Sequence, residues 1–224
     1  MSRISYGHQT GIFDPKKFVD PVHVIGCGGI GSALVFALAK LGVREIHLWD
    51  TDVVEDHNIP CQLVYRPTDI TDGITKPEAI AAFLERQEAE CKVVVHNEFV
   101  TADTELEGIV ISGVDSMASR MAIWQAVQEN AHLIPFYMDG RIGGESLQLL
   151  SLDPSDPDDV EMYEAWLFPD EEAAELPCAE RTVIHPAVTL SGLMIAQITR
   201  FLRELPPVSN VMFDMKTMQY TQSR

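Results

Sequence analysis

The stretch that decides the fold is Val22-His23-Val24-Ile25-Gly26-Cys27-Gly28-Gly29-Ile30-Gly31, followed by a helical pattern that runs to residue 41. A strand that turns directly into a helix needs residues without Cβ atoms at the bend, and small residues where the helix approaches the strand. The start of such a helix offers unpaired N–H groups and the positive end of its dipole to a phosphate. The stretch therefore predicts a strand–turn–helix unit that binds a nucleotide.

A carboxylate follows at the spacing that this unit requires. Asp50 lies 19 residues after Gly31, at the end of the next strand-like segment. A carboxylate at that place can reach a ribose hydroxyl. Taken alone, the glycines and Asp50 fit a domain that binds NAD, one that binds ATP, or one that binds neither.

Apolar runs and helical patterns alternate along the first 131 residues. The strand-like segments are 21–25, 45–50, 92–97 and 109–113, and the helix-like segments are 29–41, 76–90 and 117–131. This alternation predicts βαβ units, a parallel sheet and helices on both of its faces.

The second half of the chain has a different pattern. Segments 133–138 and 146–152 are joined by a short glycine-rich connection at 139–144, which favours an antiparallel hairpin. A helix is expected over 185–202, and strands over 210–215 and 218–221. Residues 153–180 are acidic and weakly periodic, which is typical of an exposed crossover loop. We expect one Rossmann-like α/β domain over 1–224, mostly parallel, with antiparallel strands at its C-terminal end.

The composition limits which classes of binding partner and which cellular compartment we expect. The formal net charge is −18, and an acidic surface repels nucleic acids and anionic membranes. The four cysteines, Cys27, Cys61, Cys91 and Cys178, form no C-x-x-C pair, which argues against a disulfide framework and a zinc ribbon. The N-terminus has no apolar signal core and no 18-residue apolar run occurs. We expect a cytoplasmic protein without nucleic-acid or membrane partners.

Polar residues from separate segments are predicted to meet at one edge of the sheet, because ligands bind beyond the carboxyl ends of parallel strands. They are Asp50, Asp52, Asn58, Gln62, Lys76 and Asp115. A lysine that neutralises phosphate and an aspartate that holds Mg²⁺ are what a triphosphate requires. A hydride-transfer enzyme that uses NAD leaves Lys76 and Asp115 unexplained.

With these motifs in order, the chain over about 20–221 resembles the superfamily of ThiF, MoeB and ubiquitin-activating enzymes. The matching elements are Gly26, Gly28, Gly29 and Gly31; Asp50 and Asp52; Asn58 and Gln62; Lys76-Pro77; Asp115 with Arg120; and Cys178-Ala179-Glu180. The resemblance implies ATP-dependent adenylation of a C-terminal glycine on a small ubiquitin-like or sulfur-carrier protein. It also implies a homodimer.

The resemblance assigns roles to these positions. The four glycines, Asp50, Asp52, Asn58, Gln62 and Lys76 would bind the nucleotide. Asp115 would hold Mg²⁺, Lys76 and Asp115 would assist the chemistry, and Cys178 would accept the activated tail. The alternatives for the polar residues are local: a strand-end acid for Asp50, a helix cap for Asp115, loop-stabilising amides for Asn58 and Gln62, and a small buried thiol for Cys178.

The departures from the family pattern concern cationic and metal-binding positions. Cys61 stands where the family has an arginine that contacts phosphate, and Ser5 and His8 replace two more arginines near the N-terminus. Lost cationic donors weaken the stabilisation of a reacting phosphate. Tyr163 and Trp166 occupy the first C-x-x-C spacing and the chain ends at Arg224, so no zinc is expected.

Three other functions stay open on the sequence. A peptide-adenylating enzyme of the microcin-maturing kind would use the same site on a shorter substrate. A non-catalytic relative that binds a nucleotide or a tail would explain the missing arginines. A tRNA-modifying cyclase belongs to the same superfamily, but the net charge of −18 argues against it.

Overall fold

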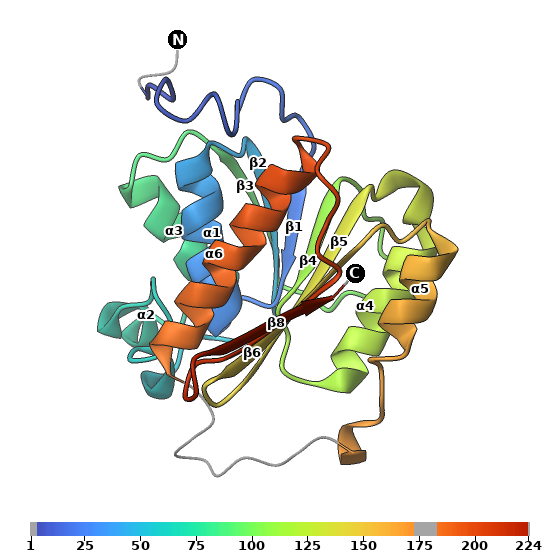
Figure 1. The fold of residues 1–224 in the computed structure, drawn as a ribbon. Coiled ribbons are helices and arrows are strands. Elements are labelled where there is room, and N and C mark those ends of the chain that lie inside the picture. Colours follow the sequence, from blue (N-terminus) through green and yellow to red (C-terminus); the bar gives the residue numbers. More distant parts are fainter. Residues whose placement is uncertain (1–3, 173–182, 224) are drawn as a thin grey trace.

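The structure is a computed structural model that describes residues 4–172 and 183–223. Its centre is an eight-stranded sheet in the order β3-β2-β1-β4-β5-β6-β7-β8 (Figure 1). The strands are β1 (Val22–Ile25), β2 (Glu45–Trp49), β3 (Lys92–His96), β4 (Ile109–Ser112), β5 (Phe136–Gly143), β6 (Ser146–Leu152), β7 (Asn210–Asp214) and β8 (Gln219–Ser223). Pairing is parallel from β3 to β5 and antiparallel from β5 to β8. The predicted fold class is confirmed.

Helices cover both faces of this sheet (Figure 1). The helices are α1 (Gly29–Leu41), α2 (Pro67–Thr71), α3 (Lys76–Arg86), α4 (Met117–Glu129), α5 (Pro157–Glu164) and α6 (Ile184–Phe201), with short 3-10 turns η1 (Asp56–Asn58), η2 (Ala131–Leu133) and η3 (Asp170–Glu172). One apolar core lies between the sheet and α1, α3 and α6, and a second lies under α4 and α5. Parallel strands with right-handed crossovers produce this two-sided arrangement.

The hairpin between β5 and β6 is longer than expected. Residues 139–143, predicted as connection, continue β5, and the turn consists only of Gly144 and Glu145. Gly144 has a φ of +62°, which lets the chain reverse in two residues. Gly140 lies inside the strand because α6 passes so close that a Cβ there would overlap Met194. Asp139 and Arg141 are therefore fixed on a rigid strand.

The predicted acidic crossover loop at 153–180 contains secondary structure in its described part. Residues 157–164 form α5 instead of loop, and Tyr163 on this helix is fully buried. Asp156 caps the helix by accepting from the amide of Asp158, and Pro157 occupies its first turn. The weak periodicity of this helix hid it, because α5 contributes one large anchor to the core and leaves its acidic residues outside.

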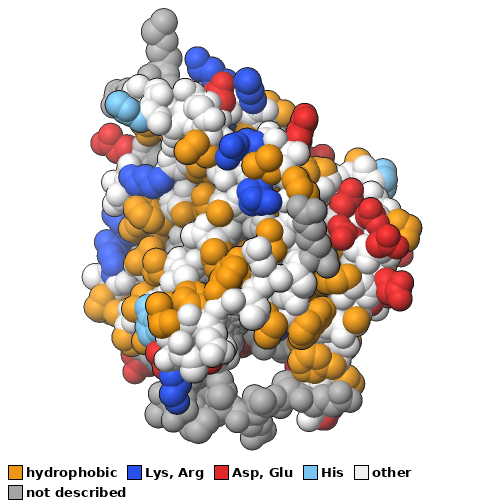
Figure 2. Space-filling model, viewed as in Figure 1, with side chains coloured by type: hydrophobic (Ala, Val, Ile, Leu, Met, Phe, Trp, Pro, Cys, Tyr) orange, Lys and Arg blue, Asp and Glu red, His pale blue; other side chains and the backbone are white. Residues whose placement is uncertain are grey.

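The surface of the described residues has two further features. Figure 2 shows hydrophobic side chains spread along α6 and acidic side chains gathered on the side of α5.

None of the helices in the described part of the chain has the length and apolar character needed to cross a membrane.

Candidate nucleotide-binding site

The turn between β1 and α1 requires glycine at two positions, because neither has room for a Cβ atom. Gly26 has a φ of +94°, and a Cβ there would lie 2.9 Å from the carbonyl carbon of Gly113. A Cβ on Gly31 would overlap the carbonyl oxygen of Gly26. Nothing lies within 4 Å of the Cβ position of Gly28. Gly26 and Gly31 thus allow the turn to form, while Gly28 leaves free space beside it.

Asp50 ties the end of β2 to this turn. Its Oδ2 accepts from the backbone N of Cys27 at 2.7 Å, and its Oδ1 accepts from the backbone N of Asp52 at 2.9 Å. The carboxylate is half-buried between the two segments. Each carboxylate oxygen has a second lone pair, so these bonds leave Asp50 able to accept from a ribose hydroxyl.

Lys76 forms an ion pair with Asp52 beside the turn. Its Nζ lies 2.6 Å from Oδ2 of Asp52, and the lysine side chain is 10% exposed against 64% for the aspartate. The backbone N of Lys76 also donates to the carbonyl of Asp52. The predicted convergence of Lys76 and Asp52 is therefore present, and the lysine charge is paired within the chain.

The two predicted amides have different surroundings. Asn58 is buried, and its Oδ1 accepts from the backbone N of Glu55, the residue before η1, which is the loop-stabilising role. The Oε1 of Gln62 is buried without a hydrogen-bond partner among the described residues. A buried acceptor without a donor costs free energy, so Gln62 has a polar atom left for a ligand.

The positions of the missing arginines hold no cation. Cys61 is buried, and its thiol donates to the carbonyl of His57 at 3.1 Å. Ser5 and His8 are exposed. The sequence leaves Arg3, Arg66 and Arg141 as cations that could replace them. Arg66 pairs with Asp69 at 3.0 Å and Arg141 pairs with Asp139 at 2.8 Å, while Arg3 lies outside the described residues.

Asp115 is the free carboxylate of the site. It follows β4, is exposed, and makes no hydrogen bond or ion pair with the described residues. Within the same residues, no three His, Cys, Asp or Glu side chains form a metal-binding group. Mg²⁺ in nucleotide enzymes commonly takes one or two carboxylates and completes its shell with phosphates and water. Asp115 fits that role.

The helices α1 and α4 begin at the same end of the sheet but differ in their caps. The N-terminus of α1 has no side-chain cap and no acidic residue in its first turn. In α4, Ser116 caps the amide of Ser119, and the carboxylate of Asp170 accepts from the amides of Met117 at 2.6 Å and Ala118 at 3.1 Å. Of these two helices, α1 is therefore the one whose first turn has no side-chain cap among the described residues and can receive a phosphate.

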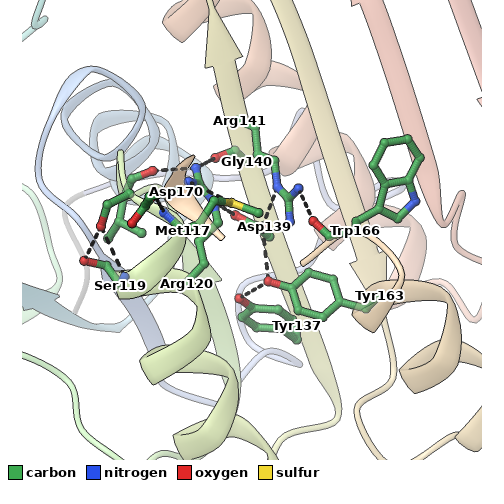
Figure 3. A network of polar contacts seen from close by, with 12 residues as sticks. Met117, Ser119, Arg120, Tyr137, Asp139, Gly140, Arg141, Tyr163, Trp166 and Asp170 are labelled. Atoms are coloured by element: carbon green, nitrogen blue, oxygen red, sulfur yellow. Dashed lines mark hydrogen bonds and ion pairs between the residues drawn. The ribbon is translucent and has the colours of Figure 1, made fainter. Parts of the chain in front are cut away.

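A buried polar network joins α4, β5 and α5 (Figure 3), and within it Nη2 of Arg120 donates to the carbonyl of Val114, the residue before Asp115. The carboxylate of Asp139, fully buried, accepts from Nε of Arg120 at 3.1 Å, from Nε of Arg141 at 2.8 Å and from the hydroxyl of Tyr163 at 3.1 Å. Arg141 also donates to the carbonyl of Trp166 at 2.8 Å. The positions with zinc-ligand spacing, Tyr163 and Trp166, are thus held by hydrogen bonds to β5.

A second cluster lies under the ends of β2 and β3. The ring of Trp49 stacks on His96 with centroids 3.6 Å apart, His47 lies beside His96, and His23 stacks on His47. The indole of Trp49 donates to Nδ1 of His23. Burial, helped by the neighbouring imidazoles, lowers the pKa of His23 to about 3. These stacked rings lie at the end of β2, the strand that Asp50 follows.

Sequence reasoning missed Asp170 as part of this end of the molecule, and it considered Arg141 only as a replacement for the missing arginines, not as a partner of Asp139. Asp170 is separated by 53 residues from the amide it caps, so no local spacing could reveal the contact. Cys178, the predicted acceptor of the activated tail, lies outside the described residues.

Comparisons with known proteins agree with this geometry. The chain matches the ThiF family over residues 19–224. It is 33% identical over 104 residues to the adenylyltransferase and sulfurtransferase MOCS3 of Aedes aegypti, covering 44% of this chain and 23% of that protein. It is also 33% identical over 103 residues to the NEDD8-activating enzyme E1 catalytic subunit of Drosophila melanogaster, covering 44% and 22%.

Two other matches extend the comparison. The tRNA threonylcarbamoyladenosine dehydratase of Escherichia coli K12 is 31% identical over 128 residues, which are 54% of this chain and 46% of that protein. The fold is similar to that of Escherichia coli MccB solved with ATP, with a TM-score of 0.71, 17% identity, and coverage of 94% of this chain and 65% of that chain. The chain spans less than half the length of each of these curated relatives.

Proposed function

Because the chain belongs to the ThiF family, we propose that it adenylates the C-terminal carboxylate of a small ubiquitin-like or sulfur-carrier protein, using ATP and Mg²⁺. The observation that carries the proposal is the free first turn of α1, with open space over Gly28, at the sheet end that also holds Asp50, Lys76 and Asp115. The relatives named as adenylyltransferase and NEDD8-activating enzyme support the same reaction.

The proposed chemistry follows from charge and position. ATP would lie with its phosphates on the α1 N-terminus and its ribose on Asp50, while Gln62 offers its unpartnered oxygen. The tail carboxylate attacks the α-phosphorus, forming an acyl-adenylate and releasing pyrophosphate. Lys76, released in part from Asp52, would neutralise phosphate charge.

Magnesium has a limited role in this account. Asp115 would hold the ion, which supplies positive charge to the leaving pyrophosphate. Because Asp115 makes no hydrogen bond or ion pair with the described residues, no such interaction has to break for it to bind the ion.

The alternatives have weaker support. A non-catalytic relative would explain why Cys61, Ser5 and His8 stand where arginines are expected. The tRNA dehydratase relative suggests a nucleic-acid substrate, but a net charge of −18 would repel the phosphate backbone of such a substrate. MccB supports the fold, and peptide adenylation stays an alternative substrate class.

We further propose that the protein is a homodimer, that each subunit is a single domain, and that it is located in the cytoplasm. Exposed apolar side chains on α6 and the last hairpin support an interface, among them Val188 (45% exposed), Met218 (71%) and Tyr220 (51%). Light scattering should give about twice the chain mass of 24.9 kDa, and a monomer at micromolar concentration contradicts this point.

The test of the adenylation proposal is ATP–pyrophosphate exchange. The assay uses a small protein ending in Gly-Gly, chosen from genes beside that of this chain, with its Gly-Gly-deleted form as the control. Exchange that depends on the intact tail is the expected result, and Asp115→Asn should remove most of it. ATP binding without exchange for any tail would favour the non-catalytic alternative.

The role of Cys178 is tested separately. Cys178→Ala should leave exchange intact, because forming an acyl-adenylate needs phosphate contacts and no thiol. The same variant should lose any covalent link to the carrier that a thiol reductant can break. A reducible conjugate that survives in Cys178→Ala removes this cysteine from the mechanism.

A further inference from the structure

The loop that carries Asp115 is fixed on both sides by groups from distant parts of the chain. On one side, Nη2 of Arg120 donates to the carbonyl of Val114. On the other side, the carboxylate of Asp170 accepts from the amides of Met117 and Ala118. Asp115 lies between these two anchors, and its carboxylate has no ion pair or hydrogen bond with residues 4–172 and 183–223.

The two anchors belong to one closed circuit of contacts (Figure 3). Arg120 is held by Asp139, and Asp139 also holds Arg141. Arg141 donates to the carbonyl of Trp166, four residues before Asp170. The segment that presents Asp170 is therefore tied to the same buried carboxylate that fixes Arg120.

We propose that Asp170 is a positioning residue, which holds the first turn of α4 so that Asp115 is presented to the nucleotide in a fixed geometry. The inference rests on the proposed function, because it assigns Asp115 to Mg²⁺-ATP. A carboxylate at a helix N-terminus satisfies orphan amides and interacts well with the dipole. Supporting contacts of this kind hold a functional group in the geometry that its chemistry needs.

The charge arrangement gives Asp170 a second effect. The amides of Met117 and Ala118 are already filled by the chain's own anion, so a phosphate gains nothing at α4. The first turn of α1, which has no such cap, is left as the place for the phosphates. By filling the amides of α4, Asp170 thus leaves phosphate binding to α1, while α4 presents Asp115.

The test compares Asp170→Asn and Asp170→Ala with Glu171→Gln. Glu171 is the neighbouring exposed acid in η3 and makes no described contact, so its variant removes a similar charge without uncapping α4. Two readouts are needed. Hydrogen exchange of the peptide covering 113–120 is measured without nucleotide, and calorimetry gives the Mg²⁺ concentration needed for half-maximal ATP binding.

Both Asp170 variants should speed exchange in this peptide by about tenfold, the effect of losing about 1.4 kcal/mol of local stability. They should also raise the Mg²⁺ requirement several-fold, and Glu171→Gln should change neither. Faster exchange with an unchanged Mg²⁺ requirement, or no change in either, overturns the proposal. If the unmodified protein binds no Mg²⁺-ATP, the proposed function fails instead, and the inference falls with it.

Discussion

The N-termini of α1 and α4 lie at the same end of the sheet, after the neighbouring parallel strands β1 and β4. They differ in whether side chains cap their first-turn amides. The first turn of α1 has no side-chain cap, and a Cβ on its N-cap residue Gly28 would touch nothing. The first turn of α4 is capped by Ser116 and Asp170 and braced by Arg120. The difference separates a helix end whose first-turn amides have no side-chain cap among the described residues from one whose amides are filled by the chain's own side chains.

The comparison predicts that variants of the groups that cap and brace α4 cost stability, whereas variants of the open positions, Gly28 and Asp115, cost binding. The largest effect is expected for Asp139→Ala, which leaves the buried guanidinium groups of Arg120 and Arg141 without their carboxylate. The loss in free energy of unfolding should be about 3–5 kcal/mol, measured by urea denaturation. Asp103→Ala, an exposed control, should stay within about 0.5 kcal/mol. A loss below about 1 kcal/mol would mean that the network does not hold this side together.

Within the glycine turn itself, two positions should behave differently. Gly31→Ala should lower the free energy of unfolding by about 3 kcal/mol, because its Cβ would overlap the carbonyl of Gly26. Gly28→Ala should lower it by less than about 1 kcal/mol, yet weaken ATP binding if phosphate approaches this backbone. Denaturation and calorimetry on the same two variants check both points, and equal stability losses would contradict the assignment.

These two predictions show what the sequence can and cannot reveal. The turn at Gly26–Gly31 and the strands around it were predictable because strand, turn and helix signals are local. Asp139 and Arg141 were assigned to a connection, because the glycines at 140 and 143 look like loop residues although they serve the close approach of α6 and the strand end. The Asp170 cap joins residues 53 apart, and no pattern in the chain marks that pairing.

A smaller effect should separate binding from stability at Asp115. Asp115→Asn should weaken Mg²⁺-ATP binding by about 1–3 kcal/mol while leaving the melting temperature unchanged, since the carboxylate has no described partner. Asp50→Ala should reduce both quantities, because its carboxylate also satisfies the amides of Cys27 and Asp52. A drop in melting temperature for Asp115→Asn would show that this residue is part of the scaffold.

The smallest effect concerns pH and the histidine cluster on the α1 side. His23 has a pKa of about 3 in the folded protein and an ordinary value of 6.5. Between these values the unfolded chain binds a proton that the folded protein does not, so stability falls as the pH drops below 6.5. The loss should be about 1.4 kcal/mol at pH 5.5. His23→Gln, which keeps an acceptor for Trp49, should flatten this part of the curve, and an unchanged slope would exclude His23 as its source.

The central claim is that the uncapped end of α1 and the free carboxylate of Asp115 form one site for Mg²⁺-ATP. Calorimetric titration of the unmodified protein with ATP, with and without Mg²⁺, and with NAD tests it most directly. We predict saturable ATP binding that Mg²⁺ strengthens, and NAD binding that is weaker or absent. Binding of NAD without binding of ATP would contradict it.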